Sequence, residues 1–140
     1  MGSIKKLIRL TRVFRKDKNK DIFKENYSSK LVHNQEVLDI NIRTIRNPSN
    51  KYSSLIFKEK FSSENGFRII YSKGFNSFGF KEKVDVIFCD IKNQVIETYS
   101  NFNPNKMTKL HEKAASVYVL SNNMNKFLNI KQNDLLKILK

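Results

Sequence analysis

Residues 84–91 read Val84-Asp85-Val86-Ile87-Phe88-Cys89-Asp90-Ile91, and this stretch decides the fold. Side chains alternate between the two faces of a β-strand, so Val84, Val86 and Phe88 share one face. Ile87 and Cys89 share the other face. Both faces are largely apolar, which is typical of a strand that is covered on both sides. We therefore expect this stretch to be a central strand of a β-sheet.

Further strands are expected on either side of it. Lys92-Asn93 predicts a tight turn into a partner strand at residues 94–99. Apolar and polar residues also alternate from Val37 to Ile45, after a polar turn at residues 33–36. The other expected extended segments are residues 67–71, 75–80, 115–120 and 135–139, and residues 100–113 predict a polar loop. Two short helices are expected, one capped by Ser49 or Asn50 and ending at Leu55, the other capped by Ser121 or Asn122 and ending at Leu128.

These elements predict one mainly β domain over residues 31–140, a β-rich α+β fold. Its expected architecture is a small barrel-like, antiparallel or mixed sheet with short helices. Residues 1–30 are different in character and predict a helix over residues 3–16 followed by a polar linker over residues 17–30.

The N-terminal segment is strongly basic. The first twenty residues contain eight of the 27 lysines and arginines and a single acid, Asp17. Helical spacing places one set of cations along a single stripe, namely Lys5, Arg9, Arg12 and Lys16. The opposite side is apolar and consists of Ile4, Leu7, Ile8, Leu10 and Phe14. This basic amphipathic helix has four candidate partners: its own domain, an anionic membrane surface, nucleic acid, or an acidic protein groove.

Composition narrows the class of protein. The formal net charge is +14 on 140 residues, which favours an anionic partner. The single cysteine, Cys89, cannot form an internal disulfide. No apolar run approaches the roughly 20 residues that a membrane-spanning helix needs, and Arg9 and Arg12 interrupt any signal-peptide core. We expect a cytoplasmic protein that is soluble or peripheral to a membrane, without a signal peptide or transmembrane helix.

Several segments occur in an order and spacing that resemble a known family. They are Ser54-Leu55-Ile56-Phe57, Gly66-Phe67-Arg68-Ile69-Ile70, Ser77-Phe78-Gly79-Phe80, Val84 to Asp90, Val95-Ile96 and Ser116 to Leu120, followed by Ile130 and Asn133-Asp134. Over residues 31–140 this set resembles the bacterial and archaeal domain of unknown function 192, also called uncharacterised protein family 0127. The resemblance implies a small β-rich domain with short helices and no established chemistry.

The chain departs from the family pattern at several positions. The family usually has Gly-Leu-Met-Phe at residues 54–57, an aromatic residue and Met at Gly79-Phe80, and Glu at Val119. Family glycines fall on Asn123 and Asn133, and Asn is the non-glycine residue that best tolerates a positive φ. This chain is therefore a divergent copy, in which those two turns are expected to survive.

Few residues are candidates for chemistry. Asp85 is either a ligand-binding or general-base carboxylate, with Phe78 and Phe80 beside it in a candidate ligand site, or a structural anchor that caps a turn or pairs with a lysine. Asp90 is expected in a turn. Cys89 is expected to be a buried structural thiol rather than the partner of His33 or His111. No metal-ligand spacing or phosphate-binding glycine motif occurs, so no metal or cofactor is predicted.

The middle of the chain is dense in aromatic residues, with Phe67, Tyr71, Phe75, Phe78, Phe80 and Phe88 interleaved with lysines and Arg68. They form either a core or a surface on which single-stranded RNA stacks, and the second interpretation requires Phe75 and Phe78 to be exposed.

Three hypotheses follow. The first is a non-enzymatic accessory or binding domain, delivered to an anionic membrane or acidic partner by Lys5, Arg9, Arg12 and Lys16 with Leu7, Ile8 and Phe14. The alternatives are an RNA-binding factor and a small enzyme with a pocket at Asp85.

Overall fold

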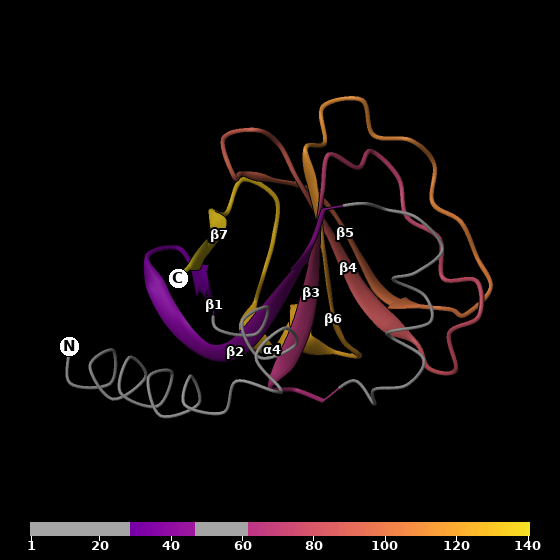
Figure 1. Cartoon of the computed structure of the whole chain (residues 1–140), viewed down its shortest axis with the longest axis horizontal. Helices are drawn as coiled ribbons and strands as arrows, with labels where there is room; N and C mark the ends of the chain where they lie inside the picture. The colour runs from indigo at the N-terminus through magenta and orange to yellow at the C-terminus, as the bar shows by residue number, and fades with distance from the viewer. Residues whose placement is uncertain (1–28, 47–61) are drawn as a thin grey trace.

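A computed structural model describes residues 29–46 and 62–140 of the chain. These residues form a seven-stranded mixed sheet and one short helix (Figure 1), so the expected β-rich class is confirmed. The elements are β1 (Ser29–His33), β2 (Glu36–Ile45), β3 (Asn65–Ile70), β4 (Val84–Cys89), β5 (Val95–Phe102), β6 (Ser116–Ser121), α4 (Met124–Leu128) and β7 (Leu136–Leu139). The strand order is β5-β4-β6-β3-β2-β1-β7, and only β2 and β3 are parallel.

The two ends of this sheet meet, which makes it barrel-like. The start of β5 pairs with the segment that leads into β7, through an isolated antiparallel bridge between Gln94 and Leu135. Backbone hydrogen bonds flank that bridge: Val95 N donates to Asp134 O and Asn133 N donates to Val95 O, both at 2.8 Å. We call residues 131–136 the closing segment, because they join the β5 edge to the β7 edge (Figure 1).

The core has two parts, one on each side of the sheet. The inner part contains Leu31, Ile40, Ile42, Ile87, Cys89, Val95, Tyr118, Leu120, Met124, Ile130 and Leu136. The outer part contains Phe67, Ile69, Phe75, Phe80, Val84, Val86, Phe88, Ala114, Val117 and Val119. β4 contributes to both parts, with Val84, Val86 and Phe88 facing outward and Ile87 and Cys89 inward, as its sequence predicted. All six residues of β4 are buried.

Two connections cover the outer part of the core. They are residues 71–83, between β3 and β4, and residues 103–115, between β5 and β6, and they run side by side (Figure 1). Their backbones pair: Thr108 N donates to Phe75 O at 2.9 Å, and Ser77 N donates to Lys106 O at 2.8 Å. Buried Phe75 and Phe80 anchor the first connection to the sheet, with their rings 5.7 Å apart and edge to face.

Three expected elements differ from the structure. Residues 75–80 are not a strand: they form one bridge at Asn76 and a turn at Phe78-Gly79, where Gly79 has a φ of 87°. β5 continues to Phe102, so the loop that follows is shorter than predicted. The N-cap of α4 is Asn123 rather than Ser121 or Asn122, and its side chain makes no capping bond because another residue provides the cap.

The hairpin at residues 33–36 and the two asparagine turns are confirmed. Asn34 and Gln35 both have positive φ, 48° and 71°, which is the pattern of the tight turn that suits a twisted hairpin. Asn123 and Asn133 also have positive φ, 73° and 74°. The expected helices at residues 3–16 and 49–55, and the linker up to residue 28, lie outside the described residues. The end of the predicted linker is wrong, because Ser29 and Lys30 already pair with β2 as the start of β1. Within the described ranges, no helix is long and apolar enough to cross a membrane.

Candidate functional site

Asp85 is completely buried, and both of its carboxylate oxygens accept hydrogen bonds from backbone amides. Its Oδ1 accepts the amide N–H of Asn101 at 3.0 Å and that of Asn123 at 3.2 Å. Its Oδ2 accepts the amide N–H of Asn125 at 2.7 Å. The carboxylate thus caps α4 from a neighbouring strand, and a negative charge at a helix N-terminus is favourable. It also ties the end of β5 to this helix, which is an anchoring role.

The three residues of the predicted ligand site are not brought together. Asp85 alternates to the inner face of β4, whereas Phe80 is buried in the outer core beside Val84 and Val86. Phe78 is half-exposed, at 51%, in the turn of the first connection. Neither aromatic ring therefore lies on the side of the sheet where the Asp85 carboxylate is held.

The cysteine and the histidines do not form a nucleophile–base pair. The Cys89 thiol is fully buried in the inner core, and burial raises its pKa to about 12. His111 lies on the opposite side of the sheet, packed on the ring of Phe88 at 4.4 Å and hydrogen-bonded through Nε2 to the Tyr99 hydroxyl at 2.9 Å. Among the described residues no group of three His, Cys, Asp or Glu side chains could hold a metal ion.

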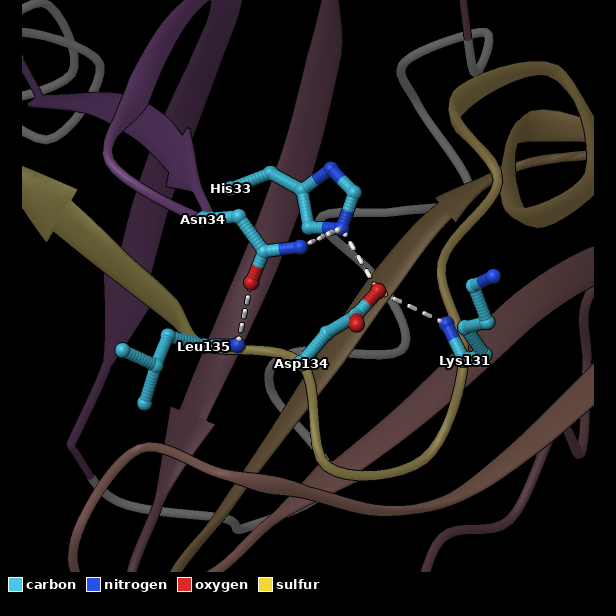
Figure 2. Close-up of polar contacts among 5 residues, drawn as sticks. All are labelled: His33, Asn34, Lys131, Asp134 and Leu135. Carbon is cyan, nitrogen blue, oxygen red and sulfur yellow. Dashed lines mark hydrogen bonds and ion pairs between the residues drawn. The ribbon is translucent and has the colours of Figure 1, made fainter.

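His33 belongs instead to a polar cluster that fastens the closing segment to the β1–β2 hairpin (Figure 2). Its Nε2 lies 2.8 Å from Oδ2 of Asp134, which also accepts the amide N–H of Lys131 at 3.0 Å. Oδ1 of the Asn34 side chain accepts the backbone N–H of Leu135 at 2.8 Å. The backbone N–H of Asn34 in turn donates to the carbonyl oxygen of Leu135 at 2.9 Å. The hairpin turn is thus bound to a segment one hundred residues further along the chain.

The electrostatics of this cluster favour a charged Asp134. Partial burial opposes ionisation of its carboxyl, but hydrogen bonds from His33 and from the Lys131 amide outweigh that effect. The net result is a pKa below the ordinary value of an aspartate. Both side chains are only 12–13% exposed, and the cluster joins the β1–β2 hairpin to the closing segment.

The largest exposed apolar side chains near the aromatic segment lie on the two outer connections. They are Tyr71 (85% exposed), Phe78 (51%), Met107 (67%) and Leu110 (73%), and we call them the apolar row. The bridge between Asn76 and Met107 and the closeness of Leu110 to Gly74 place Met107 and Leu110 where the two connections meet, and Tyr71 and Phe78 belong to the first connection. Lys73, Lys106 and Lys109 are exposed on the same two connections.

The aromatic residues that were predicted to form a stacking surface fall into two groups, one buried and one exposed. Phe67, Phe75, Phe80 and Phe88 belong to the core, so the exposure that the RNA hypothesis requires holds for Phe78 and fails for Phe75. Met107 and Leu110 were not singled out from the sequence. A signal was present, because they are isolated apolar residues within a lysine-rich loop that has no strand or helix periodicity. The predicted surface residues Lys5, Leu7, Ile8, Arg9, Arg12, Phe14 and Lys16 lie outside the described residues.

Comparison with protein families and with curated proteins finds no match. Two solved structures have a similar fold. One is a protein of unknown function from Novosphingobium aromaticivorans, 15% identical with a TM-score of 0.66, covering 78% of this chain and 82% of its own. The other, described as a putative transcription regulator from Sinorhizobium meliloti, is 14% identical with a TM-score of 0.66, covering 79% of this chain and 91% of its own. At these identities the likeness establishes a shared fold and nothing more.

Proposed function

We propose that this protein is a non-enzymatic accessory domain that attaches to an anionic membrane surface through its basic N-terminal segment. The observation that carries the proposal is that the buried carboxylate of Asp85 is engaged by backbone hydrogen bonds. The one acid fully buried in the described sheet, Asp85, spends both oxygens on three backbone amides, so it is poorly placed to accept a proton from a substrate.

Charge supplies the second support. The spacing of Lys5, Arg9, Arg12 and Lys16 predicts one stripe of a helix, and the whole chain has 27 basic residues against 13 acidic ones. Each cation near an anionic leaflet contributes about 1 kcal/mol of attraction. The apolar residues Leu7, Ile8 and Phe14 would enter the headgroup boundary beneath that stripe.

We further propose that the chain is a divergent member of the domain of unknown function 192 family. Three of the segments that carry the resemblance, residues 66–70, 84–90 and 116–120, fall on β3, β4 and β6, which contribute to the outer core. Asn123 and Asn133, which stand where the family has glycine, both have the positive φ that glycine would supply. A search for homologues that connect this chain to the family by stepwise similarity tests the assignment.

The membrane hypothesis is tested by co-sedimentation with vesicles of phosphatidylcholine and phosphatidylserine, at low and high salt. The full chain is compared with a variant in which Lys5, Arg9, Arg12 and Lys16 are all serine. We expect binding that falls more than tenfold in the variant and weakens with salt. Equal binding by both proteins would contradict the proposal. A chain that ignores vesicles and captures a single-stranded RNA or an acidic protein would replace it with one of those partners.

A small enzyme with a pocket at Asp85 is the remaining alternative. It requires the carboxylate to be available to a ligand, whereas the geometry commits it to three amides. An Asp85→Asn protein that is folded but loses a cellular phenotype would favour this alternative.

A further inference from the structure

The outer connections carry a surface that the N-terminal segment does not explain. The apolar row, Tyr71, Phe78, Met107 and Leu110, exposes half or more of each side chain, although all four are large and apolar. The connections beneath it are tightly ordered. Lys73 O accepts the amide N–H of His111 at 2.8 Å, and Ser77 Oγ donates to Asn103 O at 2.6 Å. The row is therefore presented on a paired and anchored backbone.

Alternation along this ladder explains why Met107 points outward. Phe75 and Ser77 of the first connection are buried, so Asn76 between them faces away from the core. Met107 is bridged to Asn76 and shares its side of the ladder. Leu110 lies over Gly74, where a Cβ would come within 2.9 Å of its Cδ2. Phe75 thus fills the core side of the ladder, Met107 remains on its outer side, and Leu110 is exposed beyond the bridge.

Backbone strain is present at one end of the row. Tyr71 has a φ of 58°, a left-handed conformation that is unusual for a bulky residue, and its amide is fixed to Ala115 O at 2.8 Å. The other non-glycine residues with positive φ in the described ranges are asparagines and one glutamine, which tolerate it better. The side chain of Tyr71 is 85% exposed at this position.

The charge around the row is strongly positive. Residues 71–83 and 103–113 contain six lysines, at positions 73, 81, 83, 106, 109 and 113, and two acids, Glu82 and Glu112. The excess is four positive charges before the histidine is counted. All six lysines are exposed. An apolar row within a field of lysines complements a surface that is anionic outside and apolar beneath, as a phospholipid leaflet is.

We propose that these two connections form a second, folded membrane-contact surface, in which Met107 and Leu110 enter the headgroup boundary and Lys73, Lys106 and Lys109 meet anionic headgroups. The inference deepens the proposed function and rests on it, because the same anionic membrane is the partner. Met107 and Leu110 have no π face on which a base could stack, and the two aromatic members lie at the ends of the ladder, so the surface suits lipid better than single-stranded RNA.

The test uses the full chain and four variants on phosphatidylserine-containing vesicles. The first, Met107→Ser with Leu110→Ser, removes apolar area, and its matched control, Ile91→Ser with Phe127→Ser, removes two apolar side chains of 85% and 80% exposure elsewhere. The third, Lys106→Ser with Lys109→Ser, removes charge. The fourth has serine at Lys5, Arg9, Arg12 and Lys16. The six residues replaced by serine in the first three variants are all exposed. The urea concentration at the midpoint of unfolding should therefore be the same for these variants as for the parent chain.

We expect the Met107/Leu110 variant to bind about tenfold more weakly, with the salt dependence unchanged, because apolar insertion is not screened. The Lys106/Lys109 variant should lose roughly 20-fold at low salt and little at high salt. The Ile91/Phe127 control should bind like the parent chain. A dye attached at Met107→Cys should shift to the blue on vesicles while one at Ile91→Cys does not, and the buried Cys89 thiol will not compete for the label.

The outcomes separate this inference from the proposed function. Loss of binding in the N-terminal variant, with parental binding by both loop variants and a solvent-exposed dye at residue 107, would overturn the second surface and leave the proposed function standing. Loss in the loop variants alone would support the second surface and overturn the N-terminal one. Absence of vesicle binding by the parent chain would overturn both. Loop variants that bind vesicles like the parent chain but bind an oligouridine probe more weakly would overturn the second membrane surface alone.

Discussion

Replacing Asp85 with asparagine is expected to destabilise the barrel strongly, although the two side chains have nearly the same shape. The buried carboxylate accepts amide N–H groups on both oxygens, from Asn101 and Asn123 on Oδ1 and from Asn125 on Oδ2. Asparagine has one oxygen and one NH2 group. Whichever way it is placed, its NH2 group faces a backbone donor, and at least one buried amide loses its acceptor.

The magnitude follows from these bonds. A hydrogen bond to a charged group contributes about 1.5–3 kcal/mol, and an orphaned buried donor adds a desolvation penalty. The Asn variant should therefore lose about 2–3 kcal/mol of unfolding free energy, and an Asp85→Ala variant, which leaves all three amides unpaired, about 4–5 kcal/mol. With a urea m-value of about 2 kcal/mol/M, the Asn midpoint should fall by about 1–1.5 M.

The assay is urea unfolding of the full chain followed by circular dichroism, with Asp90→Asn as the matched control. Asp90 uses only its Oδ1, which accepts the amides of Lys92 and Gln94, both at 2.9 Å. Asparagine keeps that oxygen, so the control should change the unfolding free energy by less than about 0.5 kcal/mol. Equal midpoints for the Asp85→Asn and Asp90→Asn proteins would refute the anchoring role, because they would mean that the three amides do not depend on a carboxylate.

The remaining predictions concern the closing segment and the cysteine. The folded pKa of Asp134 lies below its unfolded value, so its contribution to stability is fully present above the ordinary carboxyl pKa of about 4 and is lost as the pH falls through the lower folded pKa. Asp134→Asn should therefore lower the urea midpoint at pH 7 and change it little near pH 2; an equal loss at both pH values would show that shape rather than charge matters there. The Cys89 thiol should react with a disulfide reagent at pH 8 only as fast as the chain unfolds, since burial raises its pKa to about 12. Labelling that is complete within seconds in native buffer, with no effect of added stabiliser, would contradict its burial.

Much of the sheet could be predicted because its signals are local. β4 is apolar on both faces, and both faces are covered in the structure. The turn at residues 33–36 is polar and short, and the twist of a hairpin selects the positive φ values that Asn34 and Gln35 adopt. Asn123 and Asn133 likewise have positive φ, for which asparagine has a low steric cost.

The differences arise where distant segments decide the structure. Residues 75–80 were predicted to be extended, but they form a single bridge at Asn76 and then turn, so that Phe75 and Phe80 both reach the outer core. The cap of α4 could not be read from its own N-terminus, since it comes from Asp85, which lies 38 residues before Asn123. The same holds for His33, which appeared to be a loop residue and is bonded to Asp134 across 101 residues.

These differences also bear on function. In the described part of the chain, the polar groups best placed for chemistry serve the closure of the barrel: Asp85 holds α4, and His33 and Asp134 hold the closing segment. The interior of the described barrel is packed with Tyr118, Leu31 and other fully buried side chains, and its outer surface differs in character. On that surface the sequence places a large excess of lysine and the fold adds an ordered apolar row. The position of the row depends on pairing between two connections that lie about thirty residues apart in the chain. A local sequence pattern cannot predict such pairing.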